Sequence, residues 1–149
     1  MPRYFFDTSA LVKNYHTEVG TDDVQRILAE AGSEFLISRI ATVEMLSGFA
    51  GKVRTGVFSG ADFGILRRRF LADVRKRSLK PVRVLNAHYL IAGGLIGKHA
   101  LGRSLRTLDA IQLAVALDLH RSLPVHHFVC ADQRLCDVAS LEGLTVIQP

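Results

Sequence analysis

Residues 3–11 read Arg-Tyr-Phe-Phe-Asp-Thr-Ser-Ala-Leu, and this stretch decides the fold class that the sequence predicts. Residues 3–6 have the apolar and aromatic composition of a short buried strand. Asp7 follows the strand, and Ser9 is expected to cap a helix that continues through Lys13. A strand that passes directly into a helix is typical of sheets built from parallel strands.

The same alternation of short apolar strands and helices continues along the chain. Thr21 and Ser38 are expected to open two of the helices, and Pro81 is expected to end the helix before it. The pattern predicts an α/β fold, with a mainly parallel sheet covered on both faces, in a single domain over residues 1–149. The predicted strands are 3–6, 34–38, 128–131 and 144–148, with a strand or extended link at 82–85, and the predicted helices are 9–13, 21–31, 38–53, 60–77, 86–99, 107–123 and 133–140.

Composition sets further bounds on the class of protein. Of 149 residues, 48% are hydrophobic and 22% charged, which argues against a disordered chain. The first acid stands at position 7, too early for the apolar region of a signal peptide, and the longest apolar run, 90–97, is too short for a membrane helix. A cytoplasmic protein without a membrane segment is expected, with Cys130 and Cys136 as reduced core thiols.

The net charge of +5 is unevenly distributed. Residues 51–106 contain 13 Lys or Arg and two acids, a net charge of +11, whereas the rest of the chain has a net charge of −6. A basic surface attracts phosphate backbones. The basic segment 67–77 could bind RNA, contact a protein partner or form an ordinary solvated helix face.

Four acids stand at positions that a parallel sheet would bring together. Asp7 and Asp132 each follow a predicted strand, and the carboxyl ends of parallel strands form the edge where ligands bind. Asp109 lies in the first turn of the most apolar predicted helix, with Arg106 near enough in sequence to pair with it, and Glu44 interrupts an apolar helix segment. Each acid alone also fits a plain structural role, as a helix cap, a first-turn acid or a surface residue.

Convergence of the four acids would restrict their chemistry. Clustered carboxylates repel one another, so near neutral pH they either take up protons or hold cations. Carboxylate oxygens select hard ions such as Mg²⁺ and Mn²⁺, which activate water for attack on a phosphodiester. Ser9 is placed to hydrogen-bond a ligating carboxylate or a metal-bound water.

Four segments resemble the PIN-domain nucleases, and more narrowly the VapC-type toxins of type II toxin–antitoxin pairs. The resemblance follows their order along nearly the whole chain, with one of the four acids in each segment. The segments are YFFDTSAL (4–11), ATVEML (41–46), LRTLDAIQLA (105–114) and FVCADQRL (128–135).

The resemblance implies a three-layer α/β/α fold and Mg²⁺- or Mn²⁺-dependent endoribonuclease activity. It implies that Asp7, Glu44, Asp109 and Asp132 are the catalytic, metal-binding quartet and that Ser9 is the hydroxyl accompanying the first acid. It also implies a homodimer that a small cognate antitoxin neutralises, in some cases within a larger complex. Cys130 departs from the family pattern, because Thr or Ser commonly stands two residues before the last acid, and a thiol is the poorer hydrogen-bond donor.

Other functions remain open from the residues alone. A DNA nuclease or a small phosphoesterase outside a toxin system would use the same acids, and a PIN-like domain could bind RNA without cutting it. A phosphoacceptor domain fits poorly, because Asp7 has no paired acid and no Lys follows residue 144. The six histidines form no metal motif: His126 and His127 are expected to point to opposite faces beside a strand, and the others, His16, His88, His99 and His120, to lie at the surface or at helix ends. Phe49, Phe58 and Phe63 stand where a partner could dock but are expected in the core.

Overall fold

The computed structural model describes residues 1–149, and its centre is one sheet of five parallel strands. The order across the sheet is β3-β2-β1-β4-β5, and every neighbouring pair is parallel, which confirms the predicted sheet. The strands are β1 (Arg3–Phe6), β2 (Glu34–Ser38), β3 (Lys80–Val82), β4 (His127–Val129) and β5 (Val146–Ile147).

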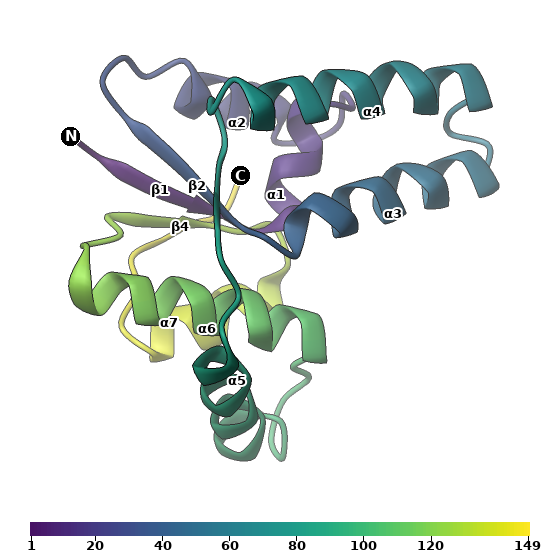
Figure 1. The fold of residues 1–149 in the computed structure, drawn as a ribbon. Helices are drawn as coiled ribbons and strands as arrows, with labels where there is room; N and C mark the ends of the chain where they lie inside the picture. Colours follow the sequence, from purple (N-terminus) through teal and green to yellow (C-terminus); the bar gives the residue numbers. More distant parts are fainter.

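Helices cover both faces of the sheet, giving the expected three layers (Figure 1). The longest helices of the first layer, α3 and α4, form an antiparallel hairpin that extends beyond the sheet (Figure 1). The first layer contains α1 (Thr8–Leu11), a 3₁₀ turn (Val12–Asn14), α2 (Thr21–Leu28), α3 (Ala41–Arg54) and α4 (Gly60–Arg75). The second layer contains α5 (Asn86–His99), α6 (Thr107–Ser122) and α7 (Gln133–Leu141).

Alternation along β1 builds two apolar cores, one on each face of the sheet. Phe5 faces the second layer, where it stacks on Phe128 of β4 with ring centroids 6.0 Å apart. Tyr4 and Phe6 face the first layer, whose core also holds Phe49. This period of two is what a strand buried on both sides requires. Phe58 and Phe63 pack against the first-layer core, as expected.

Three predicted helix caps were wrong. Asp7, not Ser9, caps α1. The helix α2 begins at Thr21 as predicted, but Gly20 is its N-cap, and the Thr21 hydroxyl donates to the carbonyl of Lys13 at 2.9 Å. Ser38 is the last residue of β2, and its hydroxyl accepts from the amide of Ile40 at 3.1 Å just before α3 begins.

The prediction that Pro81 ends the preceding helix, α4, was also wrong. The helix stops at Arg75, and Arg77 then adopts a left-handed backbone with φ of 62° that turns the chain toward the sheet. Pro81 lies within β3, which begins at Lys80, two residues before the strand or extended link predicted at 82–85. An edge strand tolerates proline because one side of its backbone has no ladder partner.

Two histidines lie at helix ends as expected, but they are buried. His88 accepts from the amide of Leu85 at 2.8 Å through Nδ1, which leaves Nε2 to donate to Asp118 at 2.9 Å. His99 pairs with Glu142 at 2.7 Å. These pairs tie α5 to α6 and to the end of α7. None of the helices is long and apolar enough to cross a bilayer.

Candidate active site

The parallel sheet places the ends of β1 and β4 at one edge, which we call the carboxyl edge. Asp7 follows β1 directly and Asp132 follows β4 by three residues. Each acid also caps a helix: Asp7 accepts from the amide of Ser9 at 3.0 Å, and Asp132 accepts from the amide of Arg134 at 2.9 Å. The capping role considered from the sequence is therefore present, and it fixes both side chains at this edge.

Helices α3 and α6 bring the other two acids to the same place. Glu44 lies in the first turn of α3 and Asp109 in the first turn of α6. A groove of about 560 Å³ is lined by all four predicted acids together with Thr8, Ser9 and Arg106. Residues separated by up to 125 positions in the sequence thus share one groove.

Asp7 is the most buried of the four, with 2% of its surface exposed. Its Oδ2 accepts from the Ser9 amide at 3.0 Å and the Ser9 hydroxyl at 2.5 Å, whereas its buried Oδ1 has no hydrogen-bond partner. Burial raises the pKa of Asp7 to about 6 against the lowering effect of Ser9, and the charges of Asp109 and Glu44 raise it further. The carboxyl group is therefore poised to exchange a proton for a cation near neutral pH.

Glu44 is held by two residues that the sequence analysis did not single out as site residues. Its Oε2 accepts from Thr8 Oγ1 at 2.9 Å and from Gln112 Nε2, which also donates to Thr8 at 3.2 Å. Gln112 is fully buried in the middle of α6, and its Oε1 has no partner. The sequence signal for Gln112 was a side-chain amide within the most apolar helix, because a buried polar group requires hydrogen-bond partners. Burial also raises the pKa of Glu44.

Arg106 is the only basic residue that lines the groove. Its Nε lies 3.2 Å from Asp109 Oδ2, as the sequence suggested, and a terminal nitrogen lies 3.7 Å from Asp132 Oδ2. Burial nevertheless raises the pKa of Asp109, against the lowering effect of Arg106. The Arg106 side chain is 72% exposed, so water weakens its compensation of the acids.

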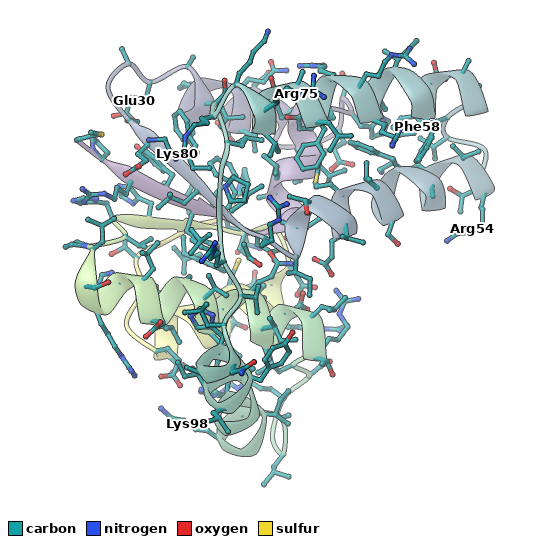
Figure 2. The ribbon with its side chains drawn as sticks, in the orientation of Figure 1. Glu30, Arg54, Phe58, Arg75, Lys80 and Lys98 are labelled. Carbon is teal, nitrogen blue, oxygen red and sulfur yellow. The ribbon has the colours of Figure 1, made fainter.

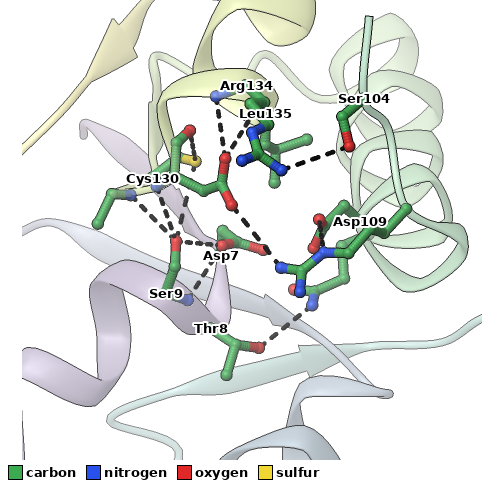
Figure 3. Close-up of polar contacts among 12 residues, drawn as sticks. Asp7, Thr8, Ser9, Ser104, Asp109, Cys130, Arg134 and Leu135 are labelled. Carbon is green, nitrogen blue, oxygen red and sulfur yellow. Dashed lines mark hydrogen bonds and ion pairs between the residues drawn. The ribbon is translucent and has the colours of Figure 1, made fainter. Parts of the chain in front are cut away.

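Ser9 joins the ends of the two strands. Its hydroxyl accepts from the amides of Ala131 and Asp132, at 3.0 and 3.3 Å, while it donates to Asp7 (Figure 3). Cys130, which replaces the family hydroxyl, lies 3.9 Å from Ser9 Oγ and donates its thiol to the carbonyl of Asp132 at 3.3 Å. The Asp132 carboxylate is instead oriented by the amides of Arg134 and Leu135 (Figure 3).

The four carboxylates share the groove without closing around one point, since no three Asp, Glu, His or Cys side chains are close enough to enclose an ion. Each is bound by a neighbour instead: Ser9, Gln112, Arg134 or Arg106. The donor set still suits Mg²⁺ or Mn²⁺, because it consists of carboxylate oxygens, and the buried Asp7 Oδ1 lacks a partner. Burial, with a smaller effect of the neighbouring carboxylates, raises the pKa values of Asp7, Glu44 and Asp109, and a bound cation would lower them.

Comparison with known proteins supplies the family. Residues 4–141 match the PIN domain model. The structure is similar to that of VapC20 from Mycobacterium tuberculosis, described as a sarcin-ricin loop cleaving toxin, with a TM-score of 0.69 and 16% identity over 98% of this chain and 99% of that one. FitAcB from Neisseria gonorrhoeae is also similar, with a TM-score of 0.64 and 16% identity over 98% and 97% of the chains. No curated protein matched the sequence. The family match spans all four acids, and the chain belongs to the PIN domain family.

Proposed function

We propose that residues 1–149 act as one Mg²⁺- or Mn²⁺-dependent endoribonuclease domain, the toxin of a cytoplasmic toxin–antitoxin pair. The observation that carries this proposal is the single groove lined by Asp7, Glu44, Asp109 and Asp132. The motifs in which these acids stand support it, as does the similarity in fold to VapC20, described as a toxin that cleaves the sarcin-ricin loop.

The four acids would hold the cation, and the cation would neutralise charge on the scissile phosphodiester and favour ionisation of the attacking water. The protein's own residues prepare the ligands. Ser9 holds Asp7 Oδ2 and leaves Oδ1 free, and the Gln112 amide fixes Glu44. Arg106 offsets the charge of Asp109 and Asp132. Locking of ligand orientation by such neighbours is what makes a metal site effective.

The nuclease claim is tested by cleavage of RNA by the purified chain in Mg²⁺, in Mn²⁺ and in a chelator. We expect cleavage in either metal, none in the chelator, and losses of about 100-fold or more in the Asp7→Asn and Asp109→Asn variants, since each replaces a charged ligand at the reacting centre. Asp137→Asn, a change of the same kind at an exposed position of α7 outside the groove, is the matched control and should retain full activity.

Wild-type rates in folded Asp7→Asn and Asp109→Asn protein would overturn the acidic-site proposal. Faster cleavage of single-stranded DNA or of a simple phosphodiester than of RNA would favour the alternative nuclease or phosphoesterase. Binding of RNA without cleavage in any metal would favour a non-catalytic PIN domain. These three outcomes separate the substrate class from the site.

The toxin role has its own test in cells. Expression of the chain should arrest growth, expression of Asp109→Asn should not, and co-expression of a small protein encoded by an adjacent reading frame should restore growth. A homodimer is expected by light scattering, and a larger assembly when the antitoxin is present. If cells expressing the active enzyme grew normally, the nuclease proposal would stand and the toxin proposal would fail.

A further inference from the structure

A second groove lies at the carboxyl edge, beside the acids. It has a volume of about 570 Å³ and is lined by Arg39, Pro81, Arg83 and Val84, with no acidic residue among them. Arg39 follows β2 and Arg83 follows β3, and the amide of Arg39 donates to the carbonyl of Val82 at 2.8 Å. Two arginines are thus held at neighbouring strand ends by the pairing of β2 with β3.

The strand order divides this edge by charge. Taken in the order β3, β2, β1, β4, the residues that follow the strands are Arg83, Arg39, Asp7 and, two positions further on, Asp132. Neighbouring strands are about 5 Å apart, so roughly 10 Å separates the ends of β3 and β1. Arg39 lines the arginine groove, and Ile40, the next residue of the chain, lines the acidic groove. The two grooves are thus linked at consecutive residues after β2, within reach of one bound strand.

Neither arginine is engaged in an ion pair. Arg83 also lines a neighbouring groove with Asp118, but that carboxylate pairs with His88 at 2.9 Å. Both arginines are exposed. A guanidinium binds phosphate oxygens through two parallel hydrogen bonds, so a groove with two free guanidinium groups suits an anionic backbone.

The basic segment 67–77 is less suited to that role. The Arg69 guanidinium lies 5.1 Å from the centroid of the Tyr15 ring and donates to the carbonyl of Asn14 at 3.4 Å. Arg77 lines a cavity with Glu34 and Lys80, which begin β2 and β3 at the opposite edge of the sheet. Figure 2 shows Lys80 near the amino ends of the strands and Arg54 at the tip of the α3–α4 hairpin. Two members of the basic segment, Arg69 and Arg77, are thus engaged away from the acidic groove.

We propose that Arg39 and Arg83 form a phosphate-binding subsite that holds the backbone of a single-stranded RNA segment beside the acidic groove. This inference rests on the proposed function, because the bound strand is the one to be cut. The subsite lies at the ends of β2 and β3, while cutting occurs at the ends of β1 and β4. Phosphates are attracted to the two arginines, which holds the RNA backbone on this side of the acidic groove.

The test measures binding rather than cleavage. A fluorescein-labelled single-stranded RNA oligonucleotide is titrated with the Asp109→Asn protein, with and without Arg39→Ala/Arg83→Ala, over a range of salt concentrations. Loss of two charge-assisted contacts should weaken binding at least about tenfold. The slope of log affinity against log salt should become shallower by about 1.4, from roughly 0.7 for each phosphate contact on a single strand.

Arg67→Ala/Arg68→Ala, which removes the same charge from exposed positions on α4, is the matched control and should change neither quantity appreciably. Arg39→Lys/Arg83→Lys should keep the salt slope and lose part of the affinity, because lysine retains charge without the planar fork. Circular dichroism checks that each variant folds.

Equal weakening by both alanine pairs, or none by Arg39→Ala/Arg83→Ala, would overturn the subsite. The same holds if that pair leaves RNA binding intact and weakens only binding of the antitoxin. The binding assay needs no turnover. If the wild-type protein failed to cut RNA but Arg39→Ala/Arg83→Ala still weakened RNA binding as expected, the subsite would stand and the proposed activity would fail.

Discussion

Carboxyl groups at the two edges of the sheet have opposite pKa shifts. At the amino edge, where the strands begin, Glu34 accepts from Arg3 at 3.0 Å and from Lys80 at 2.8 Å, and the hydrogen bond from Lys80 is the main cause of its lowered pKa. At the carboxyl edge, burial raises the pKa of Asp7 to about 6. One edge compensates its acid with two cations, and the other leaves several acids with a single exposed Arg106.

This difference separates a structural acid from a candidate functional one. A paired carboxylate stabilises the fold, whereas a buried carboxylate with raised pKa costs stability at neutral pH. Such a cost is expected where an acid serves a ligand or a reaction rather than the fold. The uncompensated acids all lie in one groove, where a divalent cation would supply the missing charge.

The difference between the two edges is tested most strongly by the same substitution, Glu to Gln, at each edge. Glu44→Gln should lower metal-dependent RNA cleavage by about 100-fold or more, because it removes a charged ligand from the groove. Glu34→Gln should leave the cleavage rate unchanged. Initial rates at saturating metal measure both. Similar rates for the two variants would show that the edges do not differ in function.

A second effect concerns stability in the absence of metal. The folded-state pKa of Asp7 lies above its ordinary value of 3.8, so the contribution of its carboxyl group to stability is fully present below about pH 4 and is lost as pH rises to about 6. Asp7→Asn should therefore be the more stable protein at pH 7, by on the order of 2 kcal/mol, and the two should converge near pH 4. Urea unfolding with chelator present measures this. An Asp7→Asn protein less stable at pH 7 would contradict the burial argument.

The smallest expected effect has the opposite sign. Glu34 has a lowered pKa, so its contribution to stability is present above its ordinary value of 4.5 and is lost as pH falls through the lower folded-state pKa. Glu34→Gln should destabilise the protein by about 1 kcal/mol at pH 7, a modest value because the paired charges are partly exposed. The difference in unfolding free energy between Glu34→Gln and wild type should shrink in acid, where the difference for Asp7→Asn also vanishes. A stabilising Glu34→Gln would be incompatible with this role.

Much of the architecture could be predicted because its signals are local. The apolar runs at 3–6 and 34–38 became β1 and β2 within the predicted bounds, and the apolar helix starting at Thr107 became α6. Strand ends were less predictable: β4 stops at Val129 and β5 covers only Val146–Ile147, because ladder length depends on the neighbouring strand. Pro81 was misinterpreted because edge position, which permits proline, is a property of the sheet and not of the segment.

The candidate site was predictable in its acids and not in what holds them. Asp7 and Asp132 follow strands, and the strand positions alone imply a shared edge. The contacts of Gln112 with Glu44 and Thr8 span 68 and 104 residues, distances at which no local pattern operates. The incomplete convergence of the carboxylates was also invisible, since it depends on Arg106 and the other partners of each acid.

The most direct test of the central claim is Mn²⁺ binding by the metal-free protein at pH 7, measured by calorimetry. Wild-type protein and Glu34→Gln should bind Mn²⁺ alike and release protons, because cation binding lowers the raised pKa values of the groove acids. The Asp7→Asn/Asp109→Asn protein should show no binding at this site. Equal Mn²⁺ affinity and stoichiometry in that double variant would contradict the account.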